Sequence, residues 1–117
     1  MELEFIENYE TDTVNLGNTE FTVIKEFSTW YLYAQELREK LNKSSVATLI
    51  AKLPDSVKRA VKHVDGKGIT RRYVVVSLVG LVIIASRIQD RALLLDIADR
   101  FVVPQILEEE IDDNTNI

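Results

Sequence analysis

The stretch from residue 73 to residue 107 constrains the fold of this chain more than any other. It opens with Tyr73 and three consecutive valines, and side chains that branch at Cβ favour a pleated strand over a helix. Ser77 can cap a helix, because apolar residues follow it at helical spacing: Leu78, Leu81, Val82 and Ala85. The pattern stops at residues 89–90 and resumes from residue 92 to residue 102. We expect the core to be built here, with most of these residues nearly fully buried: Leu81, Ile84, Leu94, Ile97 and Phe101.

The remainder of the chain predicts further strands and short helices. Residues 21–24 and 30–33 have the composition of strands, and residues 3–16 fit a weak hairpin. Helical spacing of apolar residues predicts helices over 34–41 and 46–53, and a third short helix over 56–64. The Asp-Gly-Lys-Gly sequence at 65–68 predicts a turn. The expected fold class is α+β, with a small, mostly antiparallel sheet packed against about four helices.

A chain of 117 residues is long enough for one domain with its own core. We expect an acidic N-terminal arm or weak hairpin over 1–19, the α+β domain over 20–107, and an acidic disordered tail over 108–117. The longest nearly uncharged run, residues 73–86, is shorter than the roughly 20 residues of a bilayer span. The first residues lack the basic and apolar regions of a signal peptide. These features predict a cytoplasmic protein without a membrane segment.

The residue types in this chain give little support for a catalytic function. The chain has no cysteine and a single histidine, His63, so a metal site would need carboxylates alone. Phosphate-loop, nucleophile-elbow and zinc-protease motifs do not occur. Asp96 and Asp99 are better explained as a solvated helix face than as a catalytic carboxylate pair. We therefore expect a protein that is not an enzyme and that uses neither a metal nor another cofactor.

Charge is strongly segregated along the chain. Residues 1–20 contain six acids and no base, and residues 108–117 contain five acids. Residues 38–72 contain ten bases and only three acids. A basic middle between acidic ends is therefore the main electrostatic feature of the chain.

The basic middle supplies the candidate nucleic-acid-binding residues. Residues 43–45 lie at an expected helix N-terminus, where free N–H groups and the helix dipole favour phosphate oxygens. Residues 67–72 flank the glycine turn and predict a basic hairpin. The full candidate set is Lys43, Ser44, Ser45, Lys52, Arg59, Lys62, Lys67, Arg71 and Arg72. The alternative interpretation is that these side chains form the solvated faces of short amphipathic helices.

Two apolar features predict a protein partner instead. In a strand over 30–33, Trp30 and Leu32 share one face while Tyr31 and Tyr33 share the other. Core packing accounts for one pair, and the Tyr31–Tyr33 pair is the candidate partner-binding patch if it is exposed. The three leucines at 93–95, with Val102, make that helix apolar almost all round, which favours a homodimer.

Three segments, taken in order, carry a family resemblance. Trp30-Tyr31-Leu32-Tyr33 leads directly into a helix, Ser77-Leu78-Val79-Gly80-Leu81 follows a strand, and Phe101-Val102-Val103-Pro104 closes the apolar stretch. This order resembles the BRO-type N-terminal domain (Bro-N) of baculovirus repeated-ORF proteins and phage antirepressors. In the last segment phenylalanine stands for the family's tryptophan, at a shorter spacing. The resemblance covers residues 20–107.

The resemblance implies a viral or phage regulatory module that binds DNA. The alternative is an antirepressor-like or host-directed inhibitor that binds another protein, such as a repressor or a host regulator, and does not bind DNA itself. Eleven uncompensated acids at the two ends would repel a duplex unless they point away from the basic face or fold over it. The distribution of charge on the folded chain discriminates between these two hypotheses.

Overall fold

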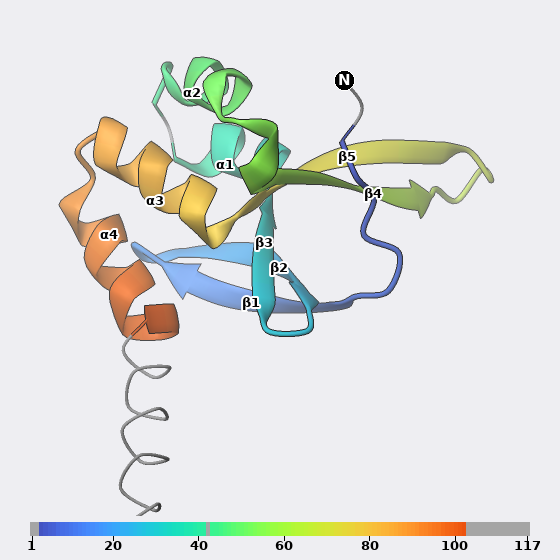
Figure 1. Ribbon diagram of the computed structural model, residues 1–117, viewed down its shortest axis with the longest axis horizontal. Coiled ribbons are helices and arrows are strands. Elements are labelled where there is room, and N and C mark those ends of the chain that lie inside the picture. Colours follow the sequence, from blue (N-terminus) through green and yellow to red (C-terminus); the bar gives the residue numbers. More distant parts are fainter. Residues whose placement is uncertain (1–2, 42, 103–117) are drawn as a thin grey trace, which may run out of the picture.

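Five antiparallel strands form one sheet in the order β1-β2-β3-β5-β4 (Figure 1). The structure is a computed structural model that describes residues 3–41 and 43–102. The strands are β1 (Glu10–Leu16), β2 (Thr19–Glu26), β3 (Thr29–Tyr33), β4 (Lys58–Val64) and β5 (Thr70–Ser77). The expected disordered tail at 108–117 lies outside the described residues.

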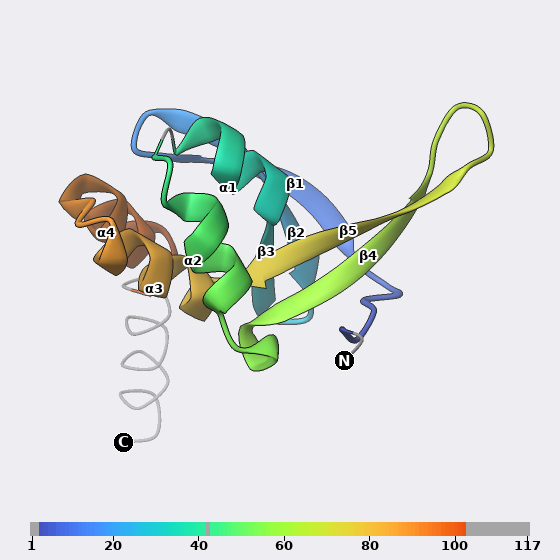
Figure 2. The same cartoon turned by 90° about the horizontal axis from the view of Figure 1, so that it is seen from above.

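The four helices gather toward one end of the molecule in both ribbon views (Figures 1 and 2). α1 (Ala34–Lys40), α2 (Val46–Lys52) and the 3-10 turn η1 (Asp55–Val57) connect β3 to β4. α3 (Leu78–Arg87) follows β5, and α4 (Arg91–Ile97) continues into a π-helical turn, η2 (Ala98–Val102). The α+β prediction is therefore confirmed.

Local hydrogen bonds explain where α3 and α4 begin. The Ser77 hydroxyl accepts the Gly80 N–H at 3.3 Å, so the predicted N-cap is confirmed. The Asp90 carboxylate caps α4 by accepting the Leu93 N–H at 3.1 Å. Gly80 allows α3 to approach β5 closely, because a Cβ at this position would lie 2.4 Å from a methyl carbon of Val76.

The main core lies between the helices and one face of the sheet. Leu81, Ile84 and Ile97 are buried as predicted. Leu94 and Phe101 are only half-buried, so most of the five predicted residues, though not all, are nearly fully buried. Leu93 takes the place of Leu94, because it lies four residues before Ile97 and therefore on the same face of α4.

A second, smaller core occupies the opposite face of the sheet. Its buried members are Ile6, Ile24, Tyr31, Val61 and Val75. Three half-buried tyrosines pack against it: Tyr9, Tyr33 and Tyr73. Each strand that contributes to both cores therefore buries alternate side chains on alternate faces.

The expected helix over 56–64 is wrong. Residues 55–57 form one 3-10 turn, and β4 follows, pairing with β5 at seven successive positions. The apolar residues of this segment fit a helical spacing, but the successive residues Ala60 and Val61 are both buried, on opposite faces of the strand, and Val61 belongs to the smaller core. Pairing with the β-branched strand β5 outweighs a weak local helical pattern.

The expected hairpin within residues 3–16 is also wrong. β1 pairs along its whole length with β2, so the expected boundary at residue 20 falls inside a hairpin of the sheet. The preceding segment lies at the other edge, where Phe5 bridges to Ala60 of β4. Two backbone hydrogen bonds of 2.9 Å hold it there, and Ile6 is buried in the smaller core. Residues 4–6 and 10–16 therefore belong to the folded domain.

Candidate nucleic-acid interface

The distal half of the β4–β5 hairpin extends well beyond the rest of the sheet (Figure 2). We call residues 62–72 of this hairpin the arm. Four of its basic side chains are exposed: Lys62, Lys67, Arg71 and Arg72. Figures 1 and 2 both show the arm as an isolated two-stranded ribbon, which is a shape that the major groove of DNA can admit.

Two cations lie directly opposite each other on the arm. The register pairs Lys62 with Arg72, so their side chains lie on the same face of the ribbon. Like charges in directly opposed positions destabilise a sheet. The Phe5 ring lies beneath both, with its centre 4.3 Å from the Lys62 ammonium and 5.6 Å from the Arg72 guanidinium, and these cation–π contacts counteract the repulsion.

The turn at the tip of the arm is fixed by Asp65. Its carboxylate accepts the N–H groups of Lys67 and Ile69 at 2.9 and 3.0 Å, and Arg71 lies 3.3 Å away. Gly68 has a φ of 78°, which supplies the left-handed conformation that the turn needs. The predicted turn at 65–68 is confirmed. Hydrogen bonds from the Ile69 and Lys67 amides lower the pKa of Asp65 below its ordinary value, and the Arg71 contact acts in the same direction.

This shift predicts that acid opens the tip of the arm. The folded pKa of Asp65 is lower than the unfolded one, so its contribution to stability is complete above about pH 4 and is lost as the pH falls through the lowered value. Hydrogen exchange at the Lys67 and Ile69 amides should therefore accelerate below about pH 4, beyond the intrinsic pH dependence. Asp65→Asn is the control and should remove this additional acceleration. Equal protection of both amides in acid and at neutral pH would contradict the assignment.

A cleft of about 410 Å³ lies where α1 and α2 face β5 at the base of the arm. Its lining includes three cations, Arg38, Lys58 and Arg72, and no carboxylate among the described residues. Gln35 and the two tyrosines Tyr33 and Tyr73 add neutral polar groups. Arg72 belongs to both the cleft and the arm, so the two features adjoin at this residue.

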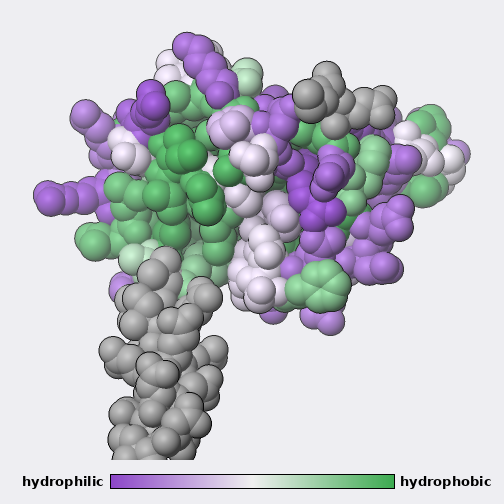
Figure 3. Space-filling view, viewed as in Figure 1, coloured by the Kyte–Doolittle hydropathy of each residue, from purple (hydrophilic) through white to green (hydrophobic). Residues whose placement is uncertain are grey.

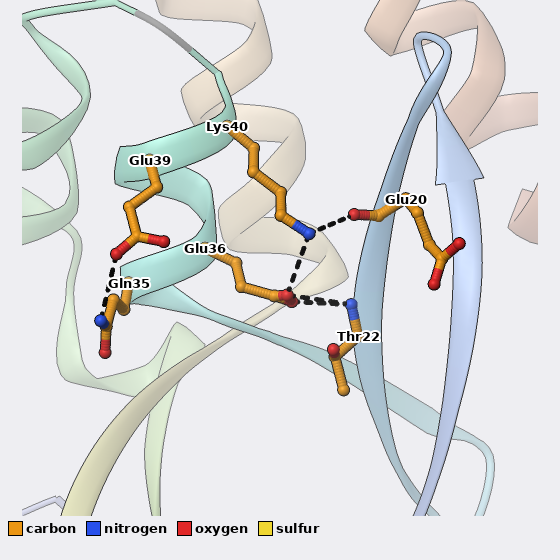
Figure 4. Close-up of polar contacts among 6 residues, drawn as sticks. All are labelled: Glu20, Thr22, Gln35, Glu36, Glu39 and Lys40. Atoms are coloured by element: carbon orange, nitrogen blue, oxygen red, sulfur yellow. Dashed lines mark hydrogen bonds and ion pairs between the residues drawn. The ribbon is translucent and has the colours of Figure 1, made fainter.

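Polar contacts with β2 fix the orientation of α1 beside this cleft (Figure 4). The Glu36 carboxylate accepts the Thr22 N–H at 2.7 Å, and the Lys40 ammonium donates to the Glu20 carbonyl at 2.6 Å. Figure 4 shows Gln35 and Glu39 on the side of α1 that faces away from β2, joined by a 3.1 Å hydrogen bond. Because Glu36 and Lys40 hold the helix in this rotation, Gln35 and Arg38 reach the cleft.

The other face of the arm's base contains His63 among three tyrosines. The Tyr9 and Tyr33 hydroxyls hydrogen-bond to the two ring nitrogens of His63, and the Tyr73 ring lies 5.4 Å from the imidazole. Burial, followed by the neighbouring Tyr9 and Glu36, raises the pKa of Tyr33 to about 12, so its hydroxyl stays protonated at neutral pH. This cluster ties the N-terminal segment to β3, β4 and β5.

Only part of the predicted basic set lies on this surface. The structure brings together Lys62, Lys67, Arg71 and Arg72. Residues 43–45 are exposed at the start of α2, which both ribbon views place at the opposite end of the molecule from the tip of the arm. The Ser45 side chain makes no capping hydrogen bond. Lys52 is exposed at the last residue of α2.

Arg59 is engaged within the fold. Its guanidinium pairs with Glu26, donates to the Phe5 carbonyl at 2.9 Å and lies 5.8 Å from the Tyr31 ring centre. Burial acts to lower the pKa of Arg59, but interactions with Tyr31 and Glu26 outweigh it and raise the pKa. Arg59 thus joins the N-terminal segment, β2 and β4.

Sequence reasoning missed Arg38, whose spacing of three from Gln35 was the available signal of a shared helix face.

Tyr31 cannot contribute an exposed partner-binding patch, because it is only 8% exposed. Tyr33 is half-buried and bonded to His63. The predicted alternation itself is confirmed, since Trp30 and Leu32 pack in the main core and Tyr31 and Tyr33 in the smaller one.

Apolar surface gathers instead over α3 and α4 (Figure 3). Val79 is 61% exposed and Leu95 is 63% exposed, and Val82 is also exposed. This patch lies at the end of the molecule away from the arm.

The chain matches no protein-family model, no curated protein and no solved structure. Within residues 3–41 and 43–102, no helix combines the length and apolarity of a membrane span. The same residues contain no group of three histidine or acidic side chains that could hold a metal ion.

Proposed function

We propose that this chain is a viral or phage regulatory module that binds duplex DNA through the arm. The observation that carries the proposal is the opposed pair Lys62 and Arg72. Neither cation forms an ion pair within the described part of the chain, so both charges stay available to an external anion although they repel each other. A polyanion resolves this repulsion by supplying phosphate oxygens to both side chains.

Shape and resemblance support the same conclusion. A protruding antiparallel ribbon allows base edges to be reached while flanking side chains contact the backbone. Lys62 and Arg72 would face the groove with Thr70 and Val64, which lie opposite each other one pair farther along the same face. Lys67 at the tip and Arg71 on the other face would contact phosphates. The resemblance to Bro-N implies a function of the same kind.

Titration of a short labelled duplex by the intact protein tests this proposal. Four phosphate contacts release condensed counterions, so the log–log plot of affinity against salt should have a slope of about −3.6. That slope corresponds to an affinity about 150-fold lower in 200 mM salt than in 50 mM salt. Absence of binding at 50 mM salt would reject the proposal.

The apolar patch on α3 and α4 favours a second candidate, a regulator that acts by binding protein. Exposed apolar residues that cluster on one face mark protein contacts more often than isolated ones do. Self-association is its simplest form, and sedimentation equilibrium of the wild type and Leu95→Glu tests it. A concentration-dependent mass that the variant loses would support this candidate, whereas a monomer at every concentration would exclude self-association.

A further inference from the structure

We propose that the cleft between α1, α2 and β5 is a phosphate-binding site whose key residue is Arg38. The inference rests in part on the proposed function, because the cleft opens beside the arm and shares Arg72 with it. It adds a site that lies outside the hairpin and draws on two helices. The ligand is a phosphate group with an attached sugar, either within a nucleic-acid backbone or in a free nucleotide.

All the charged side chains that line the cleft among the described residues are positive. Arg38 and Arg72 form no ion pair within the described part of the chain. Lys58 is held in place, since its ammonium donates to the Ile50 carbonyl at 3.4 Å and lies 3.9 Å from Asp55. Lys58 is therefore a fixed, partly neutralised charge in the wall of the cleft. The planar guanidinium groups of Arg38 and Arg72 supply the donors that suit a phosphate.

The remaining lining matches the sugar that accompanies a phosphate. Small and apolar side chains from α2 and β5 form much of the surface: Ala47, Ile50, Ala51 and Val74. Gln35 adds a neutral hydrogen-bonding group. A volume of about 410 Å³ lies in the usual range of small-ligand sites.

Three variants separate the cleft from the arm in the same duplex titration. Arg38→Gln removes one positive charge that lines the cleft and lies outside the arm. Lys67→Gln combined with Arg71→Gln removes two positive charges of the arm that lie outside the cleft. Arg87→Gln is the matched control, since Arg87 is an exposed arginine near the end of α3 that lines neither feature. All three proteins should keep the thermal midpoint of the wild type, because the substituted side chains are exposed.

With Arg38 as a fifth contact the wild-type slope becomes about −4.5, and Arg38→Gln should return it to the value of about −3.6 expected for the arm. The arm variant should make the slope less negative by about 1.8, and the control should leave it unchanged. A slope for Arg38→Gln equal to that of the wild type, together with no binding of adenosine monophosphate, would overturn the cleft, and a weakened arm variant would leave the proposed function intact. An equal effect of Arg87→Gln would also overturn it, since the loss would then reflect net charge only.

Calorimetric titration with adenosine monophosphate distinguishes the two sources of phosphate. Binding by the wild type that Arg38→Gln loses and the arm variant keeps would support the cleft as a free-nucleotide site, even if duplex binding failed. Failure of both the nucleotide and every duplex titration would overturn the cleft together with the proposed function.

Discussion

Phe21→Ala should lower the free energy of unfolding by about 3–5 kcal/mol, a large fraction of the stability of a domain of this size. Phe21 has an exposed fraction of 0% and is the largest fully buried side chain in the described part of the chain. It lies in the middle of β2, opposite Val14 of β1, and belongs to the main core with Leu32, Leu37 and Leu81. Removing the ring would leave a cavity that strands on both sides cannot close.

Urea denaturation of the two phenylalanine variants measures this effect. Phe27→Ala is the matched control, because Phe27 is 100% exposed at the β2–β3 turn. The same chemical deletion there should change stability by no more than about 0.5 kcal/mol. Similar losses in the two variants would mean that the main core is not built around β2.

Arg71→Glu combined with Arg72→Glu should remove most of the DNA affinity. Two of the four arm contacts are lost, which halves the expected slope to about −1.8 and reduces the fall in affinity between 50 and 200 mM salt from about 150-fold to about 12-fold. The two new carboxylates also repel the backbone, so binding should weaken further at low salt. Fluorescence anisotropy with a labelled duplex at several salt concentrations gives both the affinity and the slope.

Arg87→Glu combined with Arg91→Glu provides a control of equal net charge. Both side chains are exposed, and they lie at the end of α3 and the start of α4, outside the arm and the cleft. This variant should bind nearly as the wild type does. If both double variants lose affinity equally, binding depends on overall charge and the arm is not its site.

The acidic N-terminal residues need a different experiment from simple truncation. Ile6 is buried and Phe5 lies beneath Lys62 and Arg72, so deleting this segment would disturb the smaller core and the arm together. Glu4→Gln with Glu7→Gln changes only the charge of two exposed side chains. If this segment screens the basic surface, the double variant should bind duplex DNA more tightly.

The sequence predicted the elements whose signals are local. The valines of β5, the Ser77 cap, the turn at residues 65–68 and the alternation of Tyr31 and Leu32 depend on neighbouring residues only, and each was found where expected. The basic hairpin was also predicted, because the bases that flank the turn are close in the sequence. Local propensity and spacing carry enough information in such cases.

Only the tertiary structure decided the features that depend on distant partners. β4 became a strand because β5 and the smaller core were available to it, although its apolar spacing also fitted a helix. Arg59 was directed inward by Glu26 and the Phe5 carbonyl, and Arg38 joined Arg72 because contacts between α1 and β2 set the rotation of the helix. The sequence determined how much positive charge the middle of the chain carries. Which of these cations are paired within the fold and which are exposed depends on contacts between residues up to 54 positions apart, and no local pattern encodes such contacts.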